Sequence, residues 1–243
     1  MRKSAYSFRR LLTFNIIVST RYFSVYRSSM ERQSTKAEQI YLTIGAVIGW
    51  FSVISQFYLN MVNRQVTIPE AVIRYFSYFT ILTNILVALC FTVLSLKGKS
   101  NWRKFFSRPK VLTAIAAYIS FVGIVYNILL RHLWNPEGLQ LIVDELLHSL
   151  IPILFILYWL IFVTKTELEW KNTLPWMIYP LVYLLYVLTR GALSGFYPYP
   201  FIDVNNLGYS NVLINDGGLM IAFMVLSLIF VAIGKLMSRS SNK

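Results

Sequence analysis

Apolar side chains fill six long runs of the chain that contain no Lys, Arg, Asp or Glu. A helix that crosses a bilayer needs about 20 consecutive, mainly apolar residues. Backbone polar groups cannot stay unpaired in lipid, so unbroken runs of this length indicate helices. The six predicted spans are Ile40–Met61, Tyr75–Leu96, Val111–Leu130, Leu146–Thr164, Asn172–Thr189 and Gly217–Gly234. We therefore expect an all-α, polytopic membrane bundle of six transmembrane helices.

The composition agrees with this fold class and excludes a soluble enzyme. Hydrophobic residues make up 56% of the 243 residues and charged residues only 14%, whereas soluble domains carry about 25% charged residues. The single cysteine, Cys90, excludes an intramolecular disulfide framework. No Cys and His residues have the spacing of a metal site, so no metal or other cofactor is predicted.

The net charge of +13 is explained by where the basic residues lie rather than by a nucleic-acid partner. Of the 23 Lys and Arg residues, 19 fall before the first span, in the second and fourth connections, or after the last span. Only Arg64, Arg74, Arg131 and Arg190 fall on the other side. Because basic residues concentrate on the cytoplasmic side, we expect a cell-membrane protein with both termini cytoplasmic and with membrane lipids as its partners. The pattern indicates no oligomeric state.

Three regions follow from the same pattern: a basic amino-terminal segment (1–37), the membrane domain (38–236) and a short cytoplasmic tail (237–243). The amino-terminal segment contains an apolar patch, Leu11–Val18, that is too short to span a membrane. An interfacial basic helix, a transit-type presequence and a start of translation at Met30 all remain open. In the last case the part before Met30 is not translated or is dispensable.

One long polar stretch, Gly195–Asp216, is rich in Pro, Tyr, Asn and Gly and lies on the outer side of the predicted topology. We expect it to be non-helical. Loops of that length are usually functional or act as lids.

Polar residues inside the second span share one helical face. Ser77, Thr80 and Asn84 have i, i+3, i+7 spacing, and Thr83 lies beside them. Such residues commonly join membrane helices by hydrogen bonds. They are also the default candidates for a functional site, because polar groups within a membrane are costly.

A histidine lies near the start of the fourth span. Asp144 and His148 are i, i+4 neighbours, so the carboxylate is able to orient the imidazole ring. That arrangement suits a general base, although a structural role is also open. A metal site is weakly indicated, because His132 is the only other histidine.

The intramembrane polar groups converge on the outer leaflet in the predicted topology, whereas the inner half is almost purely apolar. Hydrogen bonds that only join helices would not favour one leaflet, so this distribution indicates a site. The polar residues at the outer end are Thr80, Asn127, Arg131, His132, His148 and Arg190.

Three stretches resemble a known family: Tyr75–Asn84 (YFSYFTILTN), Leu147–Pro152 (LHSLIP) and Tyr197–Asp203 (YPYPFID). They are similar to the androgen-induced and androgen-dependent membrane proteins and to their bacterial relatives. These are six-span hydrolases of fatty acid esters of hydroxy fatty acids. The resemblance covers residues 38–236 and implies an intramembrane Thr nucleophile and a His, which fall by position on Thr80 and His148. Thr83 is a rival nucleophile.

The predicted activity is hydrolysis of a lipid or fatty-acyl ester. Thr80 would attack the ester carbonyl, with His148 as general base and then acid. The supporting and substrate-binding candidates are Asp144, Asn84, Asn127, Arg131, Arg190, Tyr197 and Asp203. A non-enzymatic sensor of lipids or small ligands is the alternative. A small transporter is a third, although internal repeats and broken helices are not visible in the sequence.

Overall fold

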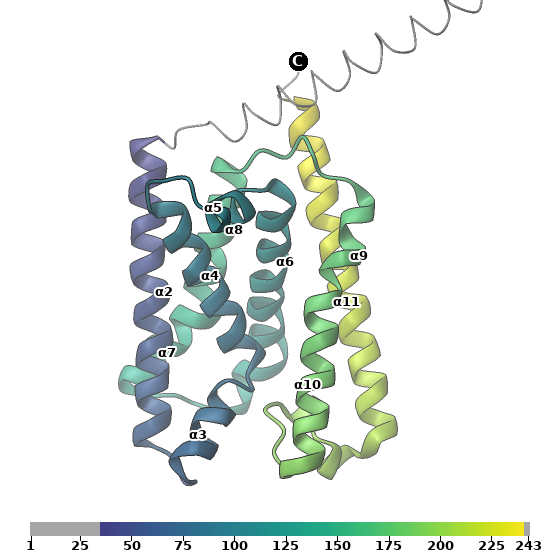
Figure 1. The fold of residues 1–243 in the computed structure, drawn as a ribbon. Coiled ribbons are helices and arrows are strands. Elements are labelled where there is room, and N and C mark those ends of the chain that lie inside the picture. The colour runs from purple at the N-terminus through teal and green to yellow at the C-terminus, as the bar shows by residue number, and fades with distance from the viewer. Residues whose placement is uncertain (1–34, 241–243) are drawn as a thin grey trace, which may run out of the picture. The chain divides into compact units, whose positions relative to one another are not determined.

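The computed structural model describes residues 35–240, and these residues form helices and connections without any strand (Figure 1). The predicted amino-terminal segment up to residue 34, including Met30, lies outside the described residues, as do residues 241–243. From Gln39 onward the chain forms one compact unit. The all-α fold class predicted from the apolar runs is confirmed.

The helices follow the apolar runs with modest changes at their ends. The main helices are α2 (Lys36–Val62), α3 (Ile68–Tyr75), α4 (Phe79–Ser95), α5 (Asn101–Phe106), α6 (Pro109–Val125), α7 (Gly138–Glu145), α8 (Ile151–Phe162), α9 (Thr173–Trp176), α10 (Ile178–Ser194) and α11 (Val204–Ser240). Two π-helical segments, Tyr126–Leu130 and Leu146–Leu150, extend α6 and join α7 to α8. Short 3₁₀ turns cover Arg131–Leu133, Trp170–Asn172 and Pro200–Ile202.

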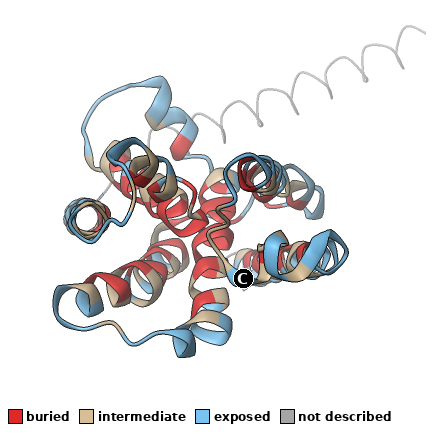
Figure 2. Cartoon of the chain, turned by 90° about the horizontal axis from the view of Figure 1, so that it is seen from below, coloured by how far each residue is buried: buried red, intermediate tan, exposed pale blue. Residues whose placement is uncertain are grey.

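Within the described residues, five helical spans are long and apolar enough to cross a membrane, and a sixth is formed if α3 and α4 act as one broken span. The packing agrees with a lipid environment. Large apolar side chains such as Leu193 (85% exposed) and Ile214 (72% exposed) face outward, while buried residues gather at the centre (Figure 2). Apolar patches this extensive are not expected on a soluble monomer. The chain is a multi-pass membrane protein.

Helix α6 forms the centre of this unit and packs against α4, α8 and α11. Ala116, Ala117 and Ile119 on this helix are fully buried. Small residues let neighbouring backbones approach closely, which is how membrane helices gain packing energy when lipid offers no hydrophobic driving force between them.

The second predicted span is not one continuous helix. The backbone breaks at residues 76–78, and the axes of α3 and α4 differ by 70°. The tertiary structure satisfies the polar groups freed by the break: the Tyr183 hydroxyl donates to the Ser77 carbonyl oxygen at 2.9 Å, and the Ser77 hydroxyl donates to the Ile73 carbonyl oxygen at 2.7 Å. Ser77 therefore lies in the break, and the prediction that it shares a helical face with Thr80 is wrong.

The long non-helical stretch predicted at Gly195–Asp216 is also wrong. Gly195, with φ of 72°, ends α10, and α11 already begins at Val204. Asp203 precedes this helix and accepts a hydrogen bond from the Asn205 backbone N–H at 3.0 Å, which is the bond that an N-terminal cap makes. The Pro residues lie before Val204, and Gly208, with a φ of 74° and a ψ of 159°, interrupts α11 after its first turn. The connection is residues 195–203.

Candidate functional site

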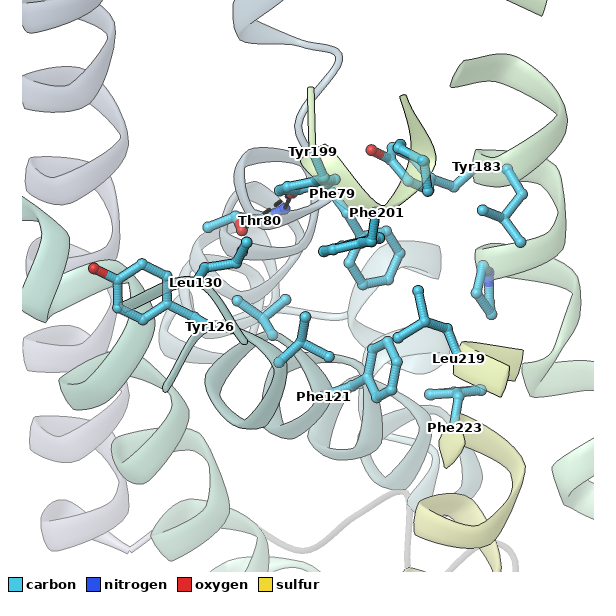
Figure 3. Close-up of a pocket in the computed structure, with 15 residues that line it drawn as sticks. Phe79, Thr80, Phe121, Tyr126, Leu130, Tyr183, Tyr199, Phe201, Leu219 and Phe223 are labelled. Atoms are coloured by element: carbon cyan, nitrogen blue, oxygen red, sulfur yellow. Dashed lines mark hydrogen bonds between the residues drawn. The ribbon is translucent and has the colours of Figure 1, made fainter. Parts of the chain in front are cut away.

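A pocket of about 620 Å³, including the open space at its mouth, lies between α4, α6, α10, α11 and the 195–203 connection. Its wall is mostly apolar and is dominated by aromatic rings, among them Phe79, Phe121 and Phe223 (Figure 3). The hydroxyl-bearing side chains in the lining are Thr80, Tyr126, Tyr183 and Tyr199. Pockets of this apolar character typically bind small apolar ligands, with a few polar groups fixing the orientation.

Thr80 lies at this wall in the first turn of α4, where the helix restarts after the break. The Tyr199 hydroxyl is its hydrogen-bond partner: the Thr80 backbone N–H donates to that oxygen at 3.2 Å, and the two hydroxyl oxygens lie 3.4 Å apart. The first N–H groups of a helix have no partner within the helix, so Tyr199 satisfies one of them. Thr80 is thus a buried hydroxyl at the positive end of a helix dipole.

Tyr199, rather than Tyr197, is the tyrosine of the YPYPFID stretch that lines the pocket. Burial raises the pKa of the Tyr199 phenol to about 12, so the phenol stays protonated at neutral pH and its O–H is able to donate a hydrogen bond. The Tyr197 ring instead packs against Gly191, where an added Cβ would lie 2.0 Å from the ring. Sequence reasoning missed Tyr199, and its place beside Tyr197 in the same stretch was the only signal for it.

Asn84 lies one turn after Thr80 and is fully buried. Its Nδ2 donates to the Thr80 carbonyl oxygen at 2.9 Å and to the Leu147 carbonyl oxygen at 3.2 Å. The first bond lies within α4, and the second joins α4 to the π-helical segment that carries His148. The group predicted to stabilise an oxyanion here positions that segment against Thr80.

His148 and Asp144 meet on consecutive helical turns. His148 Nδ1 lies 3.2 Å from Asp144 Oδ1 and 3.0 Å from the Asp144 carbonyl oxygen. The Tyr126 hydroxyl donates to the other carboxylate oxygen of Asp144, and the Tyr126 and His148 rings stack with centroids 3.7 Å apart. Tyr126 and His148 each lie in a π-helical segment, and such segments are frequent at functional sites.

Among the described residues, Thr80 and His148 are related through Tyr126 rather than through a direct hydrogen bond. Tyr126 lines the pocket together with Thr80 and stacks on His148, which is not part of the lining. Among the residues that the structure describes, no hydrogen bond joins Thr80 to His148. Tyr126, which the sequence analysis did not select, therefore contacts the predicted base and shares the pocket with the predicted nucleophile.

Asn127 has a local structural partner. Pro152 has no N–H, so the His148 carbonyl oxygen lacks its normal helical donor. Asn127 Nδ2 lies 3.3 Å from that oxygen and also donates to the Gly123 carbonyl oxygen at 2.8 Å. The Asn127 amide group therefore contacts backbone carbonyl oxygens, and Asn127 is not part of the pocket lining.

Arg131 and Arg190 are both paired with carboxylates, and neither is part of the pocket lining. Arg131 donates to Glu145. Arg190, which is 9% exposed, lies 2.8 Å from Glu70 Oε1, and its guanidinium stacks over the Phe196 ring. Arg190 therefore fastens the 195–203 connection to α3.

Two further findings bear on cofactors and on the remaining predicted residue. Among residues 35–240, no group of three or more His, Cys, Asp or Glu side chains is arranged to hold a metal ion. Asp203 lies at the start of α11, where its Oδ2 accepts a hydrogen bond from Asn206 at 2.6 Å.

Comparisons of the chain with protein-family models, with curated proteins and with solved structures found no match. The resemblance based on three short stretches therefore stays a prediction.

Proposed function

We propose that this membrane protein hydrolyses fatty-acyl esters, with Thr80 as the nucleophile and the aromatic pocket as the site for the acyl chain. The observation that carries the proposal is the position of the Thr80 hydroxyl. It lies at the wall of an apolar pocket, at the start of α4, with a phenol beside it. The resemblance to six-span ester hydrolases supports the same choice of residue.

Two features around Thr80 favour attack on an ester carbonyl. The start of α4 carries a partial positive charge that stabilises developing negative charge. The Tyr199 hydroxyl is within 3.4 Å of Thr80 Oγ1 and is protonated at neutral pH. It is therefore suited to donate a hydrogen bond to the oxyanion that forms when Thr80 attacks, a contribution that is often the largest in such reactions.

His148 is the proposed general base. In this scheme the Tyr126 ring swings aside when substrate enters, and the His148 ring, oriented by Asp144, reaches the pocket. The Thr80 hydroxyl gives its proton to His148 as the oxygen attacks the carbonyl carbon. His148 returns that proton to the leaving alkoxide, and an acyl-Thr80 intermediate remains. Water, deprotonated by His148, then releases the fatty acid and restores Thr80.

A second function, binding of a lipid or other apolar ligand without turnover, is favoured by one specific observation. The Thr80 hydroxyl is bonded to Tyr199 rather than to His148, and a threonine without a nearby base is a weak nucleophile. Such a protein would act as a membrane sensor through the same pocket.

Turnover distinguishes the two functions. Purified protein in non-ionic micelles should release the fluorescent alcohol from 4-methylumbelliferyl palmitate faster than from the acetate, because only the long chain fills the pocket. A fluorophosphonate probe should label Thr80, as identified by peptide mass spectrometry. Binding of the palmitate ester with neither product release nor labelling would support the sensor and overturn the hydrolase.

The distribution of basic residues supports an orientation in the cell membrane that places the pocket in the outer leaflet and both termini in the cytoplasm. Helix α5 and the carboxyl-terminal end of α11 lie at one end of the bundle, and α3 and the 195–203 connection lie at the other (Figure 1). In intact cells, Ser210→Cys should react with an impermeant thiol reagent, and Lys99→Cys should react only after lysis. The fully buried Cys90 is the built-in negative control. The opposite labelling pattern would reverse the orientation.

A further inference from the structure

A buried carboxylate on α11 plays no part in the proposed hydrolysis. Asp216 is 5% exposed and lies on the inward face of the helix, between Val212 and Phe223, which are also buried. The sequence pattern predicts it at the end of an outer loop, Gly195–Asp216. In the structure Asp216 is instead a residue of α11, immediately before the apolar run that begins at Gly217.

Neither carboxylate oxygen of Asp216 has a hydrogen-bond partner among the described residues, and both are shielded from solvent. An isolated buried carboxylate is costly unless a partner compensates it. Ionisable groups within membrane bundles are accordingly functional candidates by default. The missing partner is a hydrogen-bond donor.

Two neighbours of Asp216 on α11 contact or form the wall of the pocket. Leu219, one turn further along the same face of α11, is part of the pocket wall (Figure 3). The neighbouring Asn215 donates to the Phe201 carbonyl oxygen at 2.9 Å, and Phe201 also lines the pocket. Asp216 itself is not part of the lining, but it shares a helical face with Leu219 and Phe223, so a head group that extends from the pocket toward α11 approaches this carboxylate.

The charges around the pocket indicate the sign of the ligand. Arg190 and Arg131 are already paired with Glu70 and Glu145, and the pocket lining contains no Lys or Arg. Among the described residues, the acidic side chain without a partner near the pocket is thus Asp216. The aromatic wall also suits a cation, because ring faces attract ammonium groups.

We propose that Asp216 binds the ammonium head group of an alkylammonium amphiphile whose chain occupies the aromatic pocket. Three N–H donors on a primary ammonium satisfy both carboxylate oxygens, and the chain replaces open space between aromatic rings. The site does not depend on hydrolysis, so it holds for an enzyme and for a sensor alike.

The test compares decylammonium with decanol, which has the same chain and a neutral head group. Binding is measured by calorimetry on the full chain in maltoside micelles, with protein-free micelles subtracted. The wild type should bind decylammonium on the order of tenfold more tightly than decanol, since hydrogen bonds to charged groups are the stronger ones. Asp216→Asn should bring the two affinities within about twofold of each other.

Glu167→Gln is the matched control, because it removes an exposed carboxylate from the connection before α9 and should leave the preference unchanged. Asp216→Leu is a second variant that removes the polar group altogether and should abolish the preference as well. Equal affinities of the wild type for the two amphiphiles would overturn the proposal. Retention of the tenfold preference in either Asp216 variant would also overturn it.

Discussion

Thr80→Ala is expected to lower ester turnover by at least about 100-fold, whereas Thr83→Ala should retain most of it. The two residues form a matched pair on α4, because each hydroxyl contacts a tyrosine hydroxyl: Thr80 that of Tyr199 at 3.4 Å and Thr83 that of Tyr179 at 3.2 Å. Only Thr80 lines the pocket. Loss of the Thr83 hydroxyl should cost about 1 kcal/mol of stability through its hydrogen bond. Turnover of the palmitate ester and thermal unfolding are measured on both variants.

The same assay separates the roles of the neighbouring groups. His148→Ala should abolish turnover as Thr80→Ala does, and the double variant should lose little more, because residues that act as one unit are not additive. Tyr199→Phe should lower kcat more than it raises KM, because the oxyanion hydrogen bond strengthens in the transition state. A well-folded Thr80→Ala protein with wild-type turnover would end the nucleophile assignment.

Gly191→Ala is expected to disturb the pocket although it changes a residue outside the lining. A Cβ at this position would lie 2.0 Å from Tyr197 Cε1, so the Tyr197 ring must move, and with it the connection that carries Tyr199. Overpacking of this kind costs about 1–3 kcal/mol. We therefore expect a lower unfolding temperature together with reduced turnover.

Gly217→Ala is the matched control, because no atom lies within 4 Å of a Cβ built there. Alanine is favoured over glycine in a helix by about 1 kcal/mol, so this variant should be as stable as the wild type or more stable, with unchanged turnover. If both glycine variants behave alike, the contact between Gly191 and Tyr197 does not position the 195–203 connection.

The apolar runs were sufficient to predict the helical bundle, because a chain in lipid must pair its backbone groups locally. They were insufficient for the bend between α3 and α4. The stretch Tyr75–Leu96 contains no Lys, Arg, Asp or Glu that would mark a break, and the break persists because Tyr183 on α10 binds the freed Ser77 carbonyl oxygen. The sequence pattern does not reveal the early start of α11, because Asn and Gly are common loop residues, whereas Asp203 caps a helix there.

In the pocket, too, some features are predicted by local spacing and others are decided only by how the helices pack. Local spacing was enough to pair Asp144 with His148, since i and i+4 side chains on a helix are neighbours. It was also enough to identify Thr80 as a buried polar group. The contact between Thr80 and Tyr199 joins residues 119 positions apart, and the ring stack of Tyr126 on His148 joins two further helical segments. Burial of Asp216 likewise depends on the segments packed against α11. Contacts between distant segments depend on how the helices pack, and helical periodicity carries no information about which faces meet.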